Sequence, residues 1–172
     1  MTTMTLKEQD VLVLLKLLVT EDRSFTYSGL SRALDLSASE VHAGLKRATT
    51  AGLFNAHKRT TKRKALLEFL VHGLKYVFVA DRTGLTRGIP TAHAAPPLLG
   101  ILAPSPDLPP VWPDPLGSVR GEGFQPLYKS APKAARKDSH LYQLLALVDA
   151  IRAGRARERD LAAKMLEERL MK

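Results

Sequence analysis

Few residues in this 172-residue chain have the types and spacing that catalysis needs. There is no cysteine, which excludes a disulfide framework, a thiolate metal site and a cysteine nucleophile. The five histidines are scattered without the spacing of metal ligands, and the phosphate-loop, dinucleotide, nucleophile-elbow and HExxH motifs are absent. A Ser-His-Asp triad is defined by geometry and stays open at this stage. We therefore expect no enzyme activity, no cofactor and no metal.

Phosphate binding is the chemistry that the charged residues favour. The chain has a formal net charge of +9, and residues 41–90 alone contribute +8. Five basic side chains fall within seven positions of that stretch, namely Lys58, Arg59, Lys62, Arg63 and Lys64. Such a concentration indicates an acidic partner, of which nucleic acid is the commonest. A solvated basic surface is the alternative.

Residues 25–54 are expected to form the element that positions these cations. Ser28 is suited to cap a short helix that runs to about Leu34, and residues 35–37 form a tight turn. Ser37 and Glu40 then make a capping-box pattern at the start of a second helix, which ends near Gly52. Two short helices joined by a turn of about three or four residues predict a helix-turn-helix.

The second of these helices has the faces that a DNA recognition helix needs. On a helical wheel, Val41, Leu45 and Ala48 share the side that packs inward. The outer side carries, in order, Ser39, His42, Ala43, Lys46 and Arg47. Small side chains in the first turn let a helix approach base edges in the major groove, and later cations meet phosphates. We therefore predict that the first four outer residues contact bases. Arg47, the basic run and the N–H groups beside the capping Ser37 are predicted to contact phosphates.

Residues 5–55 resemble the winged-helix DNA-binding domain of MarR-type bacterial transcription regulators. The matching stretches are SGLSRALDL and LSASEVHAGLKRATTAGLF, together with the amphipathic helix before them. The resemblance implies sequence-specific binding of double-stranded DNA by a homodimer that recognises two half-sites. A structural three-helix module would share the same pattern.

The sequence departs from that family after Phe54, where a β-hairpin wing would follow. Apolar residues at helical spacing instead predict a helix over about Thr61–Gly73 that replaces or displaces the wing. A later hairpin is expected from residues 76–80 and 86–90, and it would carry Arg82 and Arg87.

A first helix is expected from a capping-box pattern at Thr5–Glu8 to about Val19, with its end near residues 20–24. Its apolar residues lie on two nearly opposite sides, so it needs two packing partners. C-terminal helices over 139–153 and 155–171 either cover the second side within one chain or pair two chains. The arginines at their junction are expected on an exposed, salt-bridged surface, and they are Arg152, Arg155, Arg157 and Arg159.

All eleven prolines lie between Pro90 and Pro132, which predicts an irregular, extended segment ordered by its own apolar side chains. Within it, residues 111–115 surround Trp112. This stretch either anchors the segment to the core or forms a docking surface for a protein partner.

Together these features predict a mostly α protein. It would have a winged-helix-like helix-turn-helix domain with a small β-hairpin over 1–89, a Pro-rich extended segment over 90–132, and C-terminal helices over 133–172. We expect a cytoplasmic, homodimeric transcription regulator, a repressor rather than an activator, that binds double-stranded DNA and no membrane. The alternative is an antitoxin-like or adaptor protein that binds a protein partner through the Pro-rich or C-terminal region. Whether a small effector binds between the helical layers stays open.

Overall fold

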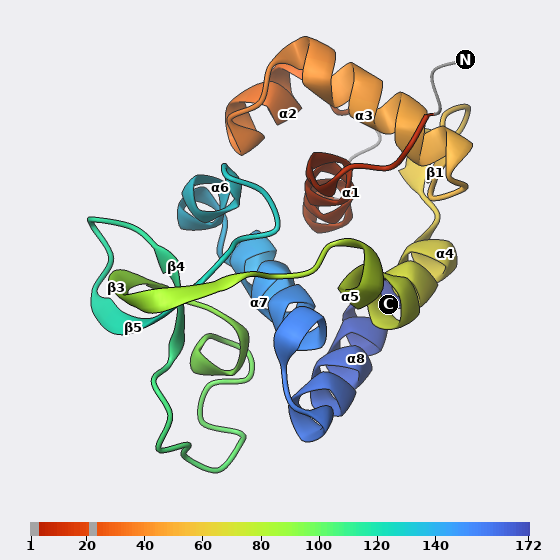
Figure 1. The fold of residues 1–172 in the computed structure, drawn as a ribbon. Coiled ribbons are helices and arrows are strands. Elements are labelled where there is room, and N and C mark those ends of the chain that lie inside the picture. Colours follow the sequence, from red (N-terminus) through yellow and green to blue (C-terminus); the bar gives the residue numbers. More distant parts are fainter. Residues whose placement is uncertain (1–3, 21–23) are drawn as a thin grey trace.

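The computed structural model describes residues 4–20 and 24–172, which form a mainly helical fold with small β-sheets (Figure 1). The helices are α1 (Glu8–Thr20), α2 (Tyr27–Leu34), α3 (Ala38–Thr50), α4 (Arg63–Glu68), α5 (Leu74–Val77), α6 (Ala131–Lys137), α7 (Ser139–Ala153) and α8 (Ala156–Leu170). The strands are β1 (Phe54–Asn55), β2 (Thr60–Thr61), β3 (Arg82–Pro90), β4 (Pro110–Pro113) and β5 (Val119–Phe124). A π-helical turn (Phe69–Gly73) joins α4 to α5, and a 3-10 turn (Ala92–Ala94) follows β3.

Helix α1 lies at the centre of the core. Figure 1 shows it between α3 and α7, and its apolar residues from Val11 to Leu18 are buried. Burying each such side chain contributes on the order of 2 kcal/mol of transfer free energy. Helix α7 therefore covers the second apolar side of α1 within one chain.

The start of α1 corrects one prediction. The helix begins at Glu8 rather than after a Thr5 cap, because the Asp10 carboxylate accepts the Lys7 N–H at 2.9 Å and satisfies an open donor of the first turn. Residues 21–23, where the end of this helix was expected, lie outside the described residues.

The two short helices predicted for residues 25–54 are present as α2 and α3. Thr26, not Ser28, caps α2: its backbone is extended and its hydroxyl accepts the Gly29 N–H at 2.9 Å. Asp35 ends α2 in the left-handed conformation, with φ of 55°. The capping box of Ser37 and Glu40 starts α3 as predicted.

A β-hairpin follows α3 directly, so the prediction that a helix takes its place is wrong. Gly52 has a φ of +79°, which turns the chain after α3, and β1 then pairs antiparallel with β2. The predicted helix exists but begins at Arg63, after the hairpin, and continues through the π-helical turn to Val77. Both elements fit because the hairpin needs only residues 54–61.

The prediction of a later hairpin is wrong in its first arm and its pairing, because residues 76 and 77 still belong to α5, but residues 86–90 lie in a strand as predicted. Strand β3 pairs instead with two strands of the Pro-rich segment, antiparallel to both β4 and β5, and β4 pairs in parallel with β5. The backbones approach closely here: a Cβ on Gly88 would lie 2.0 Å from the Trp112 carbonyl oxygen. The Pro-rich segment is therefore less irregular than predicted, and its sheet crosses the expected boundary at residue 90.

Trp112 anchors the Pro-rich segment to α7. Its side chain is 0% exposed, and its Nε1–H donates to Asp149 Oδ2 at 2.7 Å. The Thr91 hydroxyl donates to the same oxygen at 2.7 Å, and Arg152 donates to Oδ1 at 2.9 Å. Trp112 is thus a core residue and not a docking residue. Arg152 is likewise buried, contrary to the exposed position predicted for it.

The C-terminal helices agree closely with their predicted bounds. Asp138 caps α7 by accepting the N–H groups of His140 and Leu141, and Gly154 ends it. Helix α8 then packs on α7 and α4, which places the C-terminus beside α4 (Figure 1). Among the described helices, none is both long and apolar enough to cross a membrane.

Candidate nucleic-acid interface

A buried ion pair fixes the orientation of α3 on α1. Arg47 donates from Nε and from its terminal nitrogen to the two carboxylate oxygens of Asp10, each at 2.7 Å. The Asp10 side chain is 0% exposed and that of Arg47 is 14% exposed. The hydrogen bonds from Arg47 to Asp10 raise the pKa of the guanidinium. The predicted phosphate contact by Arg47 is therefore corrected, since this side chain holds two helices together.

Gly44 lets the two helices approach at the same point. A Cβ at this position would lie 2.8 Å from Asp10 Oδ1. Val41, Leu45 and Ala48 complete the buried side of α3, as the helical wheel predicts. The buried side and the ion pair together determine which residues of α3 point away from the protein.

The outer side of α3 is accessible. Ser39, His42 and Lys46 are exposed and Ala43 is partly exposed. Within the described part of the chain, the Lys46 ammonium group has no hydrogen bond or ion pair, so it is open to a ligand. The Ser37 hydroxyl is used within the helix cap, where it accepts the Glu40 N–H at 3.1 Å and lies 3.1 Å from the Ser39 hydroxyl.

Tyr27 is a candidate residue that sequence reasoning missed. It opens α2, is 38% exposed, and its ring meets the His42 ring edge-on at a centroid distance of 5.2 Å. Only the packing of α2 across α3 brings these two rings together. An exposed aromatic residue at the start of the first helix of a helix-turn-helix was the available signal.

The hairpin turn and the start of α4 carry the basic run, and the structure divides that run by residue type. The lysines Lys58, Lys62 and Lys64 are exposed, and no acceptor for their ammonium groups lies among the described residues. The arginines are engaged instead. Arg59 stacks over the Phe25 ring at 4.1 Å and donates to the Phe25 carbonyl, and Arg63 donates to the Leu170 carbonyl at 3.0 Å. Phosphate contact by Lys58, Lys62 and Lys64 fits this arrangement better than contact by Arg59 and Arg63.

A groove of about 410 Å³ separates α3 from the hairpin. Its walls contain aromatic rings, threonine hydroxyls and two cations, and none of its lining residues is acidic. They are Phe25, Tyr27, His42, Leu45, Lys46, Thr49, Thr50, Phe54, Ala56 and Arg59. Such a surface is suited to a polyanion, because cations, rings and neutral donors meet it without a repelling carboxylate.

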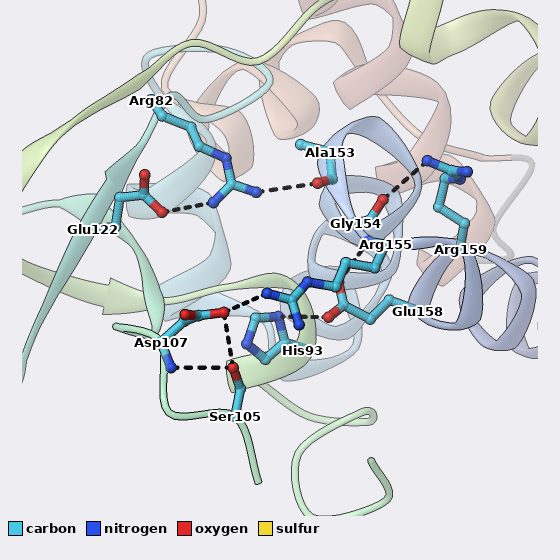
Figure 2. Close-up of polar contacts among 10 residues, drawn as sticks. All are labelled: Arg82, His93, Ser105, Asp107, Glu122, Ala153, Gly154, Arg155, Glu158 and Arg159. Carbon is cyan, nitrogen blue, oxygen red and sulfur yellow. Dashed lines mark hydrogen bonds and ion pairs between the residues drawn. The ribbon is translucent and has the colours of Figure 1, made fainter. Parts of the chain in front are cut away.

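A second polar cluster lies where the sheet meets α8 (Figure 2). Arg82 pairs with Glu122 at 2.7 Å, Arg155 pairs with Asp107 at 2.5 Å, and His93 lies 3.6 Å from Glu158. These groups border a cleft of about 420 Å³. Arg155 is exposed and ion-paired, as predicted for this junction.

Arg82 and Arg155 of this second cluster already pair with carboxylates of the same chain, and Glu158 accepts the Arg155 N–H. In the described residues there is also no group of three or more His, Cys, Asp or Glu side chains arranged to hold a metal ion. The α3 and hairpin surface, with its open ammonium groups, is therefore the stronger candidate for ligand binding.

Comparison of the chain with protein families, with curated proteins and with solved structures found no match.

Proposed function

We propose that this chain binds double-stranded DNA sequence-specifically through α3 and acts as a transcription regulator, with repression as its effect. The observation that carries the proposal is the orientation of α3. The Asp10–Arg47 pair and the buried side of the helix leave a surface that is small near its N-terminus and cationic at Lys46. This is the surface that a helix needs in order to enter the major groove.

Each outer residue has a role that follows from its size and position. Ser39 and Ala43 are small enough for base edges to approach, His42 offers ring nitrogens, and Lys46 suits guanine acceptors. The exposed Lys58, Lys62 and Lys64 would neutralise phosphates. The short hairpin would then act as a wing, which makes the domain winged-helix-like.

A homodimer belongs to this proposal, because two copies would recognise two half-sites about 34–36 Å apart. The second apolar side of α1 is already covered by α7 within one chain. Dimer formation would therefore use another surface. Light scattering of the protein at micromolar concentration would test it, and a monomer mass would contradict it.

The first test is a salt-titrated binding assay that compares DNA upstream of the gene for this protein with a scrambled duplex of equal length. We expect binding to the upstream DNA to be tighter by at least about a thousandfold. Lys46→Ala should weaken that complex. Lys164→Ala removes the same charge from an exposed position of α8 and should leave the affinity unchanged. Equal affinity for both duplexes, or no binding at low salt, would contradict the proposal.

A protein partner is the second candidate function, favoured by exposed apolar side chains in the Pro-rich segment. Because Trp112 is buried, the residues available for such a contact are Leu99, Ile101, Leu108 and Leu116, each more than half exposed. An adaptor or antitoxin-like role would place the partner there. Leu108→Ser with Leu116→Ser should abolish a partner complex and spare DNA binding if this second function exists, while Lys46→Ala should do the reverse.

A further inference from the structure

We infer that Arg59 is a positioning residue, which holds the hairpin at a fixed angle to α3, and that Lys58 beside it makes the phosphate contact. The inference rests on the proposed DNA binding. It gives different roles to Lys58 and Arg59, two adjacent cations that the sequence alone does not distinguish. Its basis is the set of contacts around Phe25.

Arg59 joins the tip of the hairpin to the start of the helix-turn-helix. Its guanidinium lies 4.1 Å from the centroid of the Phe25 ring and donates to the Phe25 carbonyl. Phe25 is 34 residues earlier in the chain, is buried, and immediately precedes the Thr26 cap of α2. One side chain thus contacts both the ring and the backbone of a residue that begins the neighbouring element.

The backbone of Arg59 shows that its side chain contributes to the geometry of the turn. Its φ of +53° lies in the left-handed region, which costs a residue with a Cβ free energy and which glycine adopts readily. A turn that needed only this backbone conformation would be served better by glycine. The stacked and hydrogen-bonded guanidinium offsets that cost, so the contact with Phe25 and the shape of the turn stabilise each other.

A continuous row of rings extends this contact to the outer face of α3. Phe25 meets Phe54 of β1 edge-on at 6.4 Å and Tyr27 at 6.3 Å, and Tyr27 in turn meets His42 at 5.2 Å. The same rings line the groove between α3 and the hairpin. Releasing Arg59 would therefore disturb the hairpin and the Tyr27–His42 contact together.

Lys58 provides a matched comparison. Its backbone N–H donates to Asn55 Oδ1 at 2.9 Å, while its side chain is exposed and makes no hydrogen bond or ion pair with the described residues. Loss of a phosphate contact lowers the slope of log affinity against log salt concentration by about 0.9. Loss of a positioning contact lowers affinity even where the substitution keeps the charge, because the hairpin that carries Lys58 is no longer held in place.

The experiment measures DNA affinity over a salt series for the wild type, Lys58→Ala, Arg59→Lys, Arg59→Gln and Phe25→Leu. We expect Lys58→Ala to reduce the slope by about one unit. Arg59→Lys keeps the charge but loses the planar guanidinium, so we expect it to bind about tenfold more weakly than the wild type. Phe25→Leu removes no charge and should weaken binding by a similar factor, and Arg59→Gln should do the same. Wild-type affinity of Arg59→Lys or of Phe25→Leu would overturn the inference.

Amide hydrogen exchange of the protein without DNA separates this inference from the proposed function. In Arg59→Lys the hairpin amide of Lys62 should exchange faster, while amides in the core of α1 stay as slow as in the wild type. The Lys62 N–H normally donates to the Leu53 carbonyl at 2.8 Å, so it reports directly on the hairpin. If even the wild type fails to bind DNA, the proposed function fails. Unchanged hairpin exchange would still overturn the positioning role.

Discussion

The two halves of the molecule each contain a buried aspartate–arginine pair, and the pairs do different work. Asp10 and Arg47 come from different helices, and the pair joins α1 to α3. Asp149 and Arg152 lie three residues apart on α7, and the second oxygen of Asp149 accepts hydrogen bonds from Trp112 and Thr91. In both pairs the carboxylate is at most 1% exposed.

The two pairs differ in the elements that they hold in place. The first orients a helix whose opposite side is exposed, so it determines which residues are available to a ligand. The second draws an otherwise irregular segment into the core, and its partners Trp112 and Thr91 are themselves 0% exposed. A buried ion pair is weak evidence for stability as such, but breaking it by removing one partner is costly. The comparison therefore predicts a functional effect for the first pair and a purely structural effect for the second.

The largest effect is expected for Asp149→Ala. The substitution leaves the buried guanidinium of Arg152 without its carboxylate and two buried donors without an acceptor, so we expect the free energy of unfolding to fall by about 4 kcal/mol or more. Denaturant unfolding followed by circular dichroism measures this. Trp112→Phe is the control, because it removes one donor and retains a packed ring, and it should cost less. A loss below that of Trp112→Phe would contradict the role of Asp149.

Arg47→Ala is expected to have the next largest effect. It leaves the Asp10 carboxylate buried and unpaired, so the free energy of unfolding should fall by about 3 kcal/mol. Lys46 is one residue earlier and exposed, so Lys46→Ala should change the free energy of unfolding by no more than about 0.5 kcal/mol. Asp10→Ala combined with Arg47→Ala should cost less than the sum of the two single changes. Equal losses for positions 46 and 47 would show that the pair does not hold α3.

For DNA binding, Lys46 is expected to contact the ligand directly, whereas Arg47 is not. Lys46→Ala should weaken specific DNA binding by about 1–3 kcal/mol if the ammonium group reaches a base edge. Arg47→Ala, measured at a temperature where the variant is still folded, should retain the wild-type salt slope because its guanidinium contacts Asp10. Fluorescence anisotropy across a salt series measures both. A reduced slope in Arg47→Ala would restore that residue to the phosphate contacts.

The smallest effect concerns Glu40 at the start of α3. The Ser37 backbone N–H, which donates to the carboxylate at 2.7 Å, lowers the pKa of Glu40 below its ordinary value. A group whose pKa is lowered by folding stabilises the fold above its unfolded pKa, about 4.3 for glutamate, and this contribution is lost as the pH falls through the folded value.

The contribution should stay below about 1 kcal/mol, because the cap is close to solvent. Glu40→Gln keeps an acceptor without the charge, so its stability should approach that of the wild type as the solution becomes acidic. Unfolding free energies of both proteins at neutral and acidic pH measure this. A difference between the two proteins that does not change with pH would contradict the assigned pKa shift.

Local patterns predicted several elements well. The capping box at Ser37–Glu40 and the apolar spacing of α3 and α7 depend on residues within one or two helical turns, so the sequence contains all the information that they need. The strands β4 and β5 were not predicted, and β3 was predicted only over residues 86–90 and with the wrong partner, because each strand forms where a distant segment supplies its hydrogen bonds. The hairpin after α3 was missed for a related reason, since its strands have two residues each and carry little periodicity.

In the candidate site, too, local features could be predicted from the sequence and long-range contacts could not. The sequence by itself determined that α3 has one apolar and one polar side and that a dense group of cations follows it, because residue type and helical period decide both. Only the tertiary structure decided which cations are open to a ligand. Arg47, Arg59 and Arg63 meet acceptors that lie far from them in the chain, at Asp10, Phe25 and Leu170. The ammonium groups of the neighbouring lysines Lys46, Lys58 and Lys62 make no hydrogen bond or ion pair with the described residues. A guanidinium can donate several hydrogen bonds and stack at once, so it is suited to join distant parts of the fold, and such partners become neighbours only when the chain has folded.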